Sequence, residues 1–183
     1  MKYIFLSILY LILFTTKTFS QVRSGVSVGY GWNKPFSSDY NSGWGVNTNA
    51  NIAIGNKWSI NPVFGYDRLN SKLRTVYDQY GFAVKRISSI GMVYTGVSGK
   101  YYFTDQWFAR AGATLFAAGG NEDLSGLGIG GTTAAGYNLN LDSHSTLEFS
   151  LTADVVNIEY SGNGVTPIAG LKVAYVFNFK GID

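Results

Sequence analysis

The feature that most constrains this sequence is an alternation of apolar and small polar residues, which recurs in eight segments between residues 22 and 179. Successive side chains of a β-strand point to opposite faces, so each segment predicts a strand with one apolar and one polar face. After residue 20, no segment sustains the 3.6-residue period of an amphipathic helix. The predicted strands cover residues 22–32, 44–54, 58–69, 94–103, 107–117, 127–141, 146–156 and 167–179.

The connections between these strands alternate between short and long. The short connections are residues 55–57, 104–106 and 142–145, and the long ones are residues 33–43, 70–86, 118–126 and 157–166. Short turns at one rim and long loops at the other are typical of outer-membrane β-barrels. Eight strands would place both ends of the chain at the short-turn, periplasmic rim.

The polar face of the predicted strands is too poor in charge to face water. It consists mostly of Gly, Ser, Asn and Thr, with six charged residues: Asp67, Lys100, Arg110, Glu148, Asp154 and Lys172. Such a face suits a narrow lumen, and the apolar face would then contact lipid. Large aromatic residues lie near the strand ends, as in the two aromatic girdles of a transmembrane barrel. They are Trp58, Phe103, Trp107 and Phe179 near the short turns, and Tyr30, Trp32, Trp44 and Tyr66 near the long loops.

Two stretches carry a resemblance to a known family. Residues 100–112 read KYYFTDQWFARAG, which resembles the middle hairpin of the small eight-stranded outer-membrane β-barrels, the OmpX-like and OmpA-like group. Residues 170–179 resemble the aromatic-ended last strand by which such barrels are recognised for insertion, although four residues follow it here. The resemblance implies an all-β fold, an eight-stranded antiparallel up-and-down transmembrane β-barrel, and contact with the barrel assembly machinery during insertion.

The first twenty residues predict a signal peptide. Lys2 is followed by an apolar run at residues 3–14 and a polar stretch at residues 15–20. An apolar run of this length is shorter than the ~20 residues that a spanning helix needs. The predicted organisation is therefore a signal peptide at 1–20 and one barrel domain at 21–183.

The charge balance gives no support for a nucleic-acid partner. The chain has 14 Lys and Arg against 11 Asp and Glu, and two of the basic residues, Lys2 and Lys17, would leave with the signal. The remaining excess gives no basis for nucleic-acid binding. Since the chain has no cysteine, it forms no disulfide and cannot be lipid-modified at its N-terminus.

The sequence offers little for catalysis. The one histidine, His144, lies in a predicted short turn between Ser143 and Ser145, without a cleft or an orienting partner. One histidine and no cysteine argue against a transition-metal site. The glycines of residues 126–131 lie in a period-2 pattern with no following helix, so they are no dinucleotide loop. We expect no enzyme activity and no cofactor.

The six lumen charges are the first candidate site. If Phe103 faces Trp107 across the turn, Lys100 lies opposite Arg110. We also expect Glu148 to face Lys172. This predicts a periplasmic-side cluster of Lys100, Arg110, Glu148 and Lys172, with Asp67 and Asp154 nearer the loops. Such a cluster could gate a narrow ion path, or its paired charges could close and stiffen the barrel.

The second long loop is the other candidate site. Its basic and aromatic residues are Lys72, Arg74, Tyr77, Tyr80, Phe82, Lys85 and Arg86. Above the outer leaflet they could bind anionic lipopolysaccharide or an external partner, or they could belong to a solvated hairpin.

The sequence thus favours a monomeric outer-membrane barrel in contact with outer-membrane lipid, with a structural, adhesion or surface-interaction role. Two alternatives remain at this stage. One is a narrow channel gated by the lumen charges, and the other is a soluble exported ligand-binding β-barrel.

Overall fold

The computed structural model describes residues 24–37, 39–72, 75–77, 80–81, 83–86, 89–119, 126–157 and 165–179. The predicted signal peptide, residues 1–20, lies outside these ranges.

Eight of the ten strands found in the described residues form a closed antiparallel β-barrel. The barrel strands are β1 (Gly25–Pro35), β2 (Tyr40–Ala53), β3 (Trp58–Ser71), β6 (Ile90–Tyr102), β7 (Trp107–Gly119), β8 (Gly126–Asn140), β9 (Ser145–Val156) and β10 (Thr166–Asn178). Each pairs with its neighbours along the chain, and β1 pairs with β10 to close the barrel. The predicted up-and-down topology is therefore confirmed.

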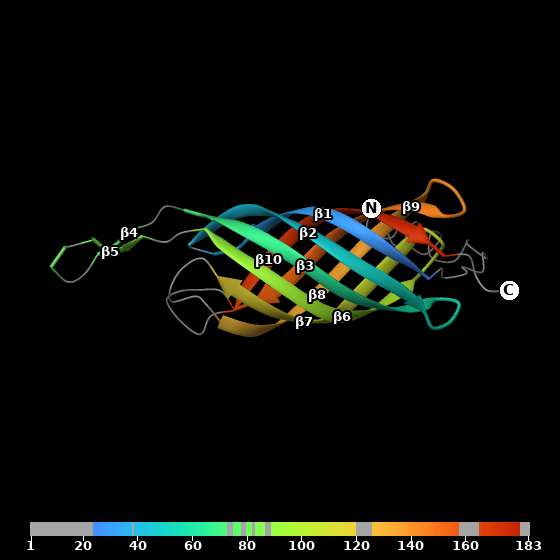
Figure 1. Ribbon diagram of the computed structural model, residues 1–183, viewed down its shortest axis with the longest axis horizontal. Helices are drawn as coiled ribbons and strands as arrows, with labels where there is room; N and C mark the ends of the chain where they lie inside the picture. The colour runs from blue at the N-terminus through green and yellow to red at the C-terminus, as the bar shows by residue number, and fades with distance from the viewer. Residues whose placement is uncertain are drawn as a thin grey trace, which may run out of the picture.

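The other two strands, β4 (Thr75–Tyr77) and β5 (Ala83–Arg86), form a separate two-stranded hairpin. Figure 1 shows this hairpin at one end of the barrel, with the β2–β3 and β8–β9 turns at the opposite end. We call these the loop end and the turn end. The hairpin occupies the second of the predicted long loops.

The first predicted long loop is wrong in length. We expected residues 33–43, but β1 continues to Pro35 and β2 begins at Tyr40. The polar residues at the end of β1 suggested a loop, yet their backbone pairs with β10, where Lys34 lies opposite Ala169. On the other side, a register irregularity between Asn41 and Gly43 lets β2 continue along β3.

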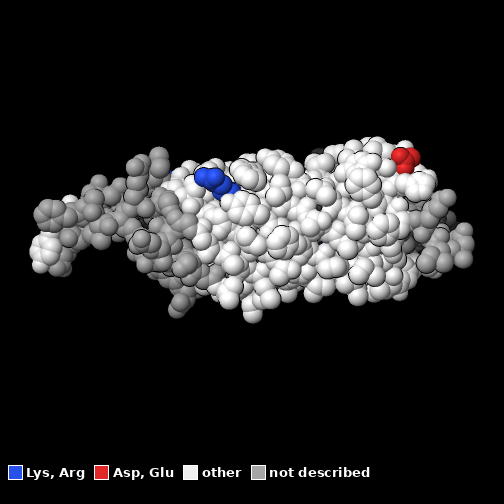
Figure 2. All heavy atoms as spheres, in the orientation of Figure 1, with Lys and Arg blue, Asp and Glu red and all other residues white. Residues whose placement is uncertain are grey.

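The two faces of the strands are as the alternation predicts. Along β1, every second residue from Gly25 to Pro35 is buried and the others are exposed. The exposed face is apolar: Val28 and Leu151, for example, are 63% and 64% exposed. On the described barrel strands, the exposed charged residues are Lys34 and Arg68. Figure 2 shows the result on one face, a wall almost without charge between a basic group near the loop end and an acidic group near the turn end.

Outward-facing aromatic rings, exposed or half-buried, gather at both ends of this wall. At the loop end the ring pairs are Tyr30–Trp44 and Trp44–Tyr66, with centroids 6.5 and 5.9 Å apart. At the turn end they are Trp58–Tyr101, Tyr101–Phe103 and Trp107–Tyr137, with centroids 4.8, 5.2 and 5.1 Å apart. An uncharged apolar band between two aromatic girdles matches the lipid-facing wall of a transmembrane barrel. A soluble barrel would instead expose charged side chains along its strands.

Candidate functional site

Near the turn end of the lumen, two cations interact with the same carboxylate, that of Glu148. Lys100 lies directly opposite Arg110 in the β6–β7 register, as the hairpin predicts. Lys100 Nζ donates a hydrogen bond to Glu148 Oε2 at 2.5 Å, and Arg110 Nη1 lies 4.0 Å from Glu148 Oε1. All three side chains are at least 87% buried. The predicted association of Glu148 with both cations is therefore present.

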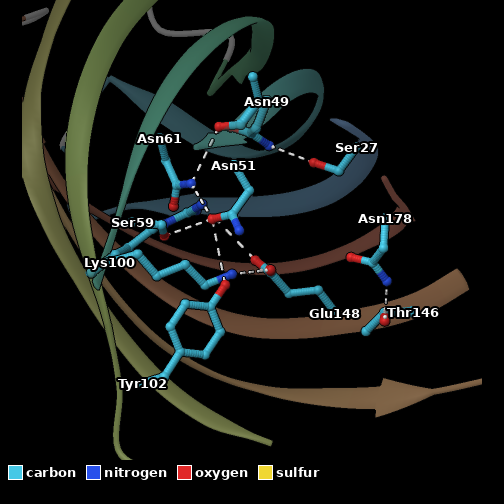
Figure 3. Close-up of polar contacts among 12 residues, drawn as sticks. Ser27, Asn49, Asn51, Ser59, Asn61, Lys100, Tyr102, Thr146, Glu148 and Asn178 are labelled. Atoms are coloured by element: carbon cyan, nitrogen blue, oxygen red, sulfur yellow. Dashed lines mark hydrogen bonds and ion pairs between the residues drawn. The ribbon is translucent and has the colours of Figure 1, made fainter. Parts of the chain in front are cut away.

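This ion pair crosses the lumen. Lys100 is on β6 and Glu148 is on β9, and two strands separate them in the sheet. The Lys100 ammonium also lies 3.8 Å from the centroid of the Phe108 ring and 5.0 Å from that of Tyr102, close enough for cation–π attraction. Figure 3 shows Lys100 and Glu148 reaching toward one another, with Tyr102 beside them. The pair acts as a strut across the barrel interior.

The prediction for Lys172 is wrong. Glu148 lies opposite Ala174, and Lys172 lies opposite Ser150. Lys172 pairs instead with Asp154, with Nζ 3.8 Å from Oδ2. The observed register differs from the assumed one by two residues. Because strand side chains alternate with a period of two, such a shift leaves every residue on its face and the alternation cannot detect it.

The second group of charges lies nearer the loop end and contains Asp154, Lys172 and Asp67. Glycines on the neighbouring strands leave space for two of these side chains, Lys172 and Asp67. In one register row, Gly31 and Gly45 lie between Lys172 and Asp67. A Cβ at Gly31 would be 2.7 Å from Lys172 Cγ, and one at Gly45 would clash with Asp67 Oδ1. The two side chains therefore occupy the space over the glycines, and Asp67 and Asp154 lie nearer the loops as predicted.

A small cavity of about 50 Å³ lies in the lumen and is bordered by both charge groups. Its charged lining residues are Asp67, Arg110, Asp154 and Lys172. Its size is enough for a few water molecules and for little else.

An apolar layer fills the lumen at the loop end. It consists of Tyr40, Leu69, Ile90, Met92, Phe116, Val156 and Ile168, all at most 8% exposed. We did not predict this layer. Its signal in the sequence is the replacement of small polar residues by large apolar ones at inward positions of the loop-end strand segments, such as Leu69 and Phe116.

The turn end of the lumen is lined by amides and hydroxyls. The Asn51 Oδ1 atom accepts hydrogen bonds from Ser59 Oγ and Asn61 Nδ2, both at 2.6 Å. Asn49 Nδ2 donates to Ser27 Oγ at 3.3 Å (Figure 3). The interior thus changes from polar at the turn end, through the strut and the cavity, to apolar at the loop end.

His144 lies in the β8–β9 turn, as the sequence predicts. Ser143 Oγ lies 2.8 Å from His144 Nδ1, but all of residues 142–144 are exposed. Asp142 accepts the backbone N–H groups of His144 and Ser145 at 2.6 and 2.7 Å. The bond from His144 holds the pKa of the Asp142 carboxyl below its usual value. These contacts fix the β8–β9 turn, and the described residues contain no group of three or more potential metal ligands.

The second candidate site lies on the β4–β5 hairpin and at its base. Lys72 Nζ donates to the Ser37 carbonyl oxygen, and the Lys72 N–H donates to that of Asp39 at 3.0 Å, so the hairpin base is attached to the β1–β2 connection. In the hairpin, Thr75 lies opposite Arg86, Val76 opposite Lys85 and Tyr77 opposite Ala83. Tyr80, at the tip, is 75% exposed. Arg74 and Phe82 lie outside the described residues.

Among the described residues, no helix is long and apolar enough to cross a membrane. No protein-family model and no curated protein matches the sequence.

Solved structures do match. Neisserial surface protein A is 17% identical with a TM-score of 0.59, over 85% of this chain and 97% of that one. Ail, the attachment invasion locus protein of Yersinia pestis, is 14% identical with a TM-score of 0.57, over 87% and 99%. The outer membrane protein OprG of Pseudomonas aeruginosa is 11% identical with a TM-score of 0.57, over 87% and 98%. The chain has the fold of the small outer-membrane β-barrels.

This outer-membrane barrel fold agrees with the family resemblance carried by residues 100–112 and 170–179. The match includes nearly the whole length of each of these solved chains, so the likeness extends around the complete barrel. A further structure of Ail, in complex with the heparin analogue sucrose octasulfate, matches with 13% identity and a TM-score of 0.50, over 86% of this chain and 98% of that one.

Proposed function

We propose that this chain resides in an outer membrane as a closed barrel with a surface-interaction role and without catalysis. The observation that carries the proposal is the combination of an obstructed lumen with a hairpin that extends from the loop end. The barrel is then a membrane anchor, and the extramembranous segments contact the partner.

The obstruction has two parts. The Lys100–Glu148 strut crosses the lumen near the turn end, and the apolar layer around Leu69 and Phe116 fills the loop end. A conducting pore needs a continuous hydrated path that ions enter and leave. The cavity between these two barriers, lined in part by charge, is what favours the alternative of a narrow channel.

The segment at residues 72–86 supports the surface role. It contains four basic residues and one acidic residue, Asp78, together with two tyrosines and a phenylalanine. Such a composition attracts polyanions. The Yersinia pestis protein is called an attachment protein and was solved with a heparin analogue, so heparin is a suitable first probe. We propose that this hairpin binds an anionic external partner.

The test uses the full chain in nanodiscs and measures heparin binding at low and high salt. Replacing Arg74, Lys85 and Arg86 together with Gln should weaken binding at least tenfold and flatten its salt dependence, because screened charge attraction would be lost. Lys57→Gln, an exposed site in a turn at the opposite end, is the control and should have no effect. Equal binding by the triple variant would contradict the proposed hairpin role.

The membrane location has its own test. The expressed protein should fractionate with outer membranes and show a heat-dependent shift in gel mobility after detergent extraction. Recovery as a soluble periplasmic protein without such a shift would contradict the location and favour the soluble barrel.

A further inference from the structure

The outer wall of the barrel has a groove of about 530 Å³ near the loop end. It lies across β3, β6 and β7 and follows two register rows of outward-facing residues. One row is Tyr66–Val93–Ala117, and the other is Arg68–Gly91–Gly119. All six of these residues line the groove.

The floor of this groove is built from small residues. A Cβ at Gly119 would meet nothing within 4 Å, so the space above this glycine is open. A Cβ at Gly91 would be 2.7 Å from Tyr66 Oη, which shows that the Tyr66 side chain lies over that glycine. The Tyr66 ring in turn contacts Trp44 of the loop-end girdle, with centroids 5.9 Å apart. The groove thus has an apolar floor and joins the aromatic girdle.

Arg68 is the charged residue of the groove. The ion pairs found among the described residues all lie inside the lumen, so no described carboxylate neutralises its guanidinium. An arginine on the lipid-facing wall is tolerated near an interface but needs an anion or water there. A guanidinium binds phosphate with two parallel hydrogen bonds, which makes phosphate the matching anion.

We propose that this groove binds lipopolysaccharide, with a lipid A phosphate on Arg68 and an acyl chain along Val93 and Ala117. Lipopolysaccharide combines a phosphate and several acyl chains in one molecule at the height of the loop-end girdle. The proposal rests on the outer-membrane location argued above. It is separate from the hairpin, since none of its residues belongs to β4 or β5.

The experiment measures binding of bisphosphorylated lipid A to the full chain in detergent by native mass spectrometry. Arg68→Gln should weaken this binding at least tenfold, as expected for the loss of a charge-assisted pair of hydrogen bonds to phosphate. Dephosphorylated lipid A should bind the parent and Arg68→Gln equally. Gly119→Leu should weaken both forms of lipid A, because its side chain would fill the groove without a clash.

Two matched controls come from the same wall. Lys34→Gln removes the other exposed charge of the strands, and Gly131→Leu fills a glycine position on β8 that is equally open and exposed. Both should bind lipid A within twofold of the parent. A heat-dependent gel shift of each variant shows that it is folded.

Three results would overturn the proposal. If Lys34→Gln loses as much affinity as Arg68→Gln, lipid binding is a diffuse charge effect. If phosphatidylglycerol binds as tightly as lipid A, the occupant is an ordinary phospholipid. If Gly119→Leu binds normally, no acyl chain lies in the groove. A failed outer-membrane location would appear in the fractionation test and not in this binding assay.

Discussion

Glu148 is the residue on which the charges at the turn end depend. It accepts a hydrogen bond from Lys100 and lies within ion-pair distance of Arg110. Lys172, which we expected in the same cluster, is compensated by Asp154. Loss of the Glu148 charge would therefore leave two buried cations, not three, without a carboxylate.

We predict that Glu148→Gln lowers the free energy of unfolding by about 3 kcal/mol, since removing one partner of a buried ion pair leaves the other charge uncompensated. Denaturant titration of the barrel in detergent, followed by the heat-dependent gel shift, measures the change. The double variant Lys100→Met with Glu148→Leu is the control and should recover the part of the loss that comes from Lys100, because an apolar pair of similar volume can replace a buried ion pair. The part that comes from Arg110 should remain, since that cation still lacks its carboxylate. A Glu148→Gln barrel as stable as the parent would show that the strut has no energetic role.

At the scale of the strands, the sequence predicts which side chains face outward and which face the lumen, but it does not predict every pairing register. The outward set on β7, with Trp107, Ala113 and Leu115, follows directly from the alternation. Tight turns also fix their own register, so Lys100 opposite Arg110 was predictable. The β9–β10 pair has a longer connection, and its shift by two residues preserves the faces, so the Lys172–Asp154 contact was not.

The ends of the strands were the least predictable part. Asn33 and Lys34 resemble loop residues, but Asn33 is buried and Lys34 exposed in the continuing alternation of β1. Their place in the barrel depends on backbone pairing with β10, which is distant in the sequence, and with β2, which follows β1 in the chain. The apolar layer at the loop end is missed for the same reason, since its members come from six strands and meet only when the barrel closes.

The orientation of the strand faces gives a direct prediction. Ala113 lies at the middle of β7 and is exposed on the apolar wall. Ala113→Arg should cost about 2–4 kcal/mol of stability, because the charge would lie at the bilayer midplane. Reversible folding into lipid vesicles measures it.

Arg68→Ala and Lys34→Ala are the comparison for this wall prediction. Both native residues are exposed near the loop end, where a charge costs about 0–1 kcal/mol, so either change should alter stability little. If Lys, Glu and Arg are tolerated equally at Ala113, Leu151 and Val173, this face does not contact lipid.

At the scale of the whole barrel, the two obstructions of the lumen lie at different heights and have no residue in common. The strut joins β6 to β9 near the turn end, while the apolar layer fills the loop end with residues such as Tyr40, Leu69 and Ile90, each fully buried. Water and ions entering from the turn end would pass the amides around Asn51 and Asn61 and meet the strut first. Removing the strut alone would connect the cavity to that end and leave the other end closed.

We therefore predict that the parent shows no steady single-channel conductance in planar bilayers, and that Glu148→Gln shows none either. The physical reason is that a buried apolar layer offers ions no polar groups in place of their hydration shell, whatever the state of the strut. A variant that also replaces Phe116 and Leu69 with Ser should conduct, because both barriers would then be polar and hydrated. Phe64→Ser, a change of comparable size on the outer wall, where Phe64 is 57% exposed, is the control and should not conduct. Steady conductance of the parent that changes in Glu148→Gln would show that the strut is a gate and that the channel alternative is correct.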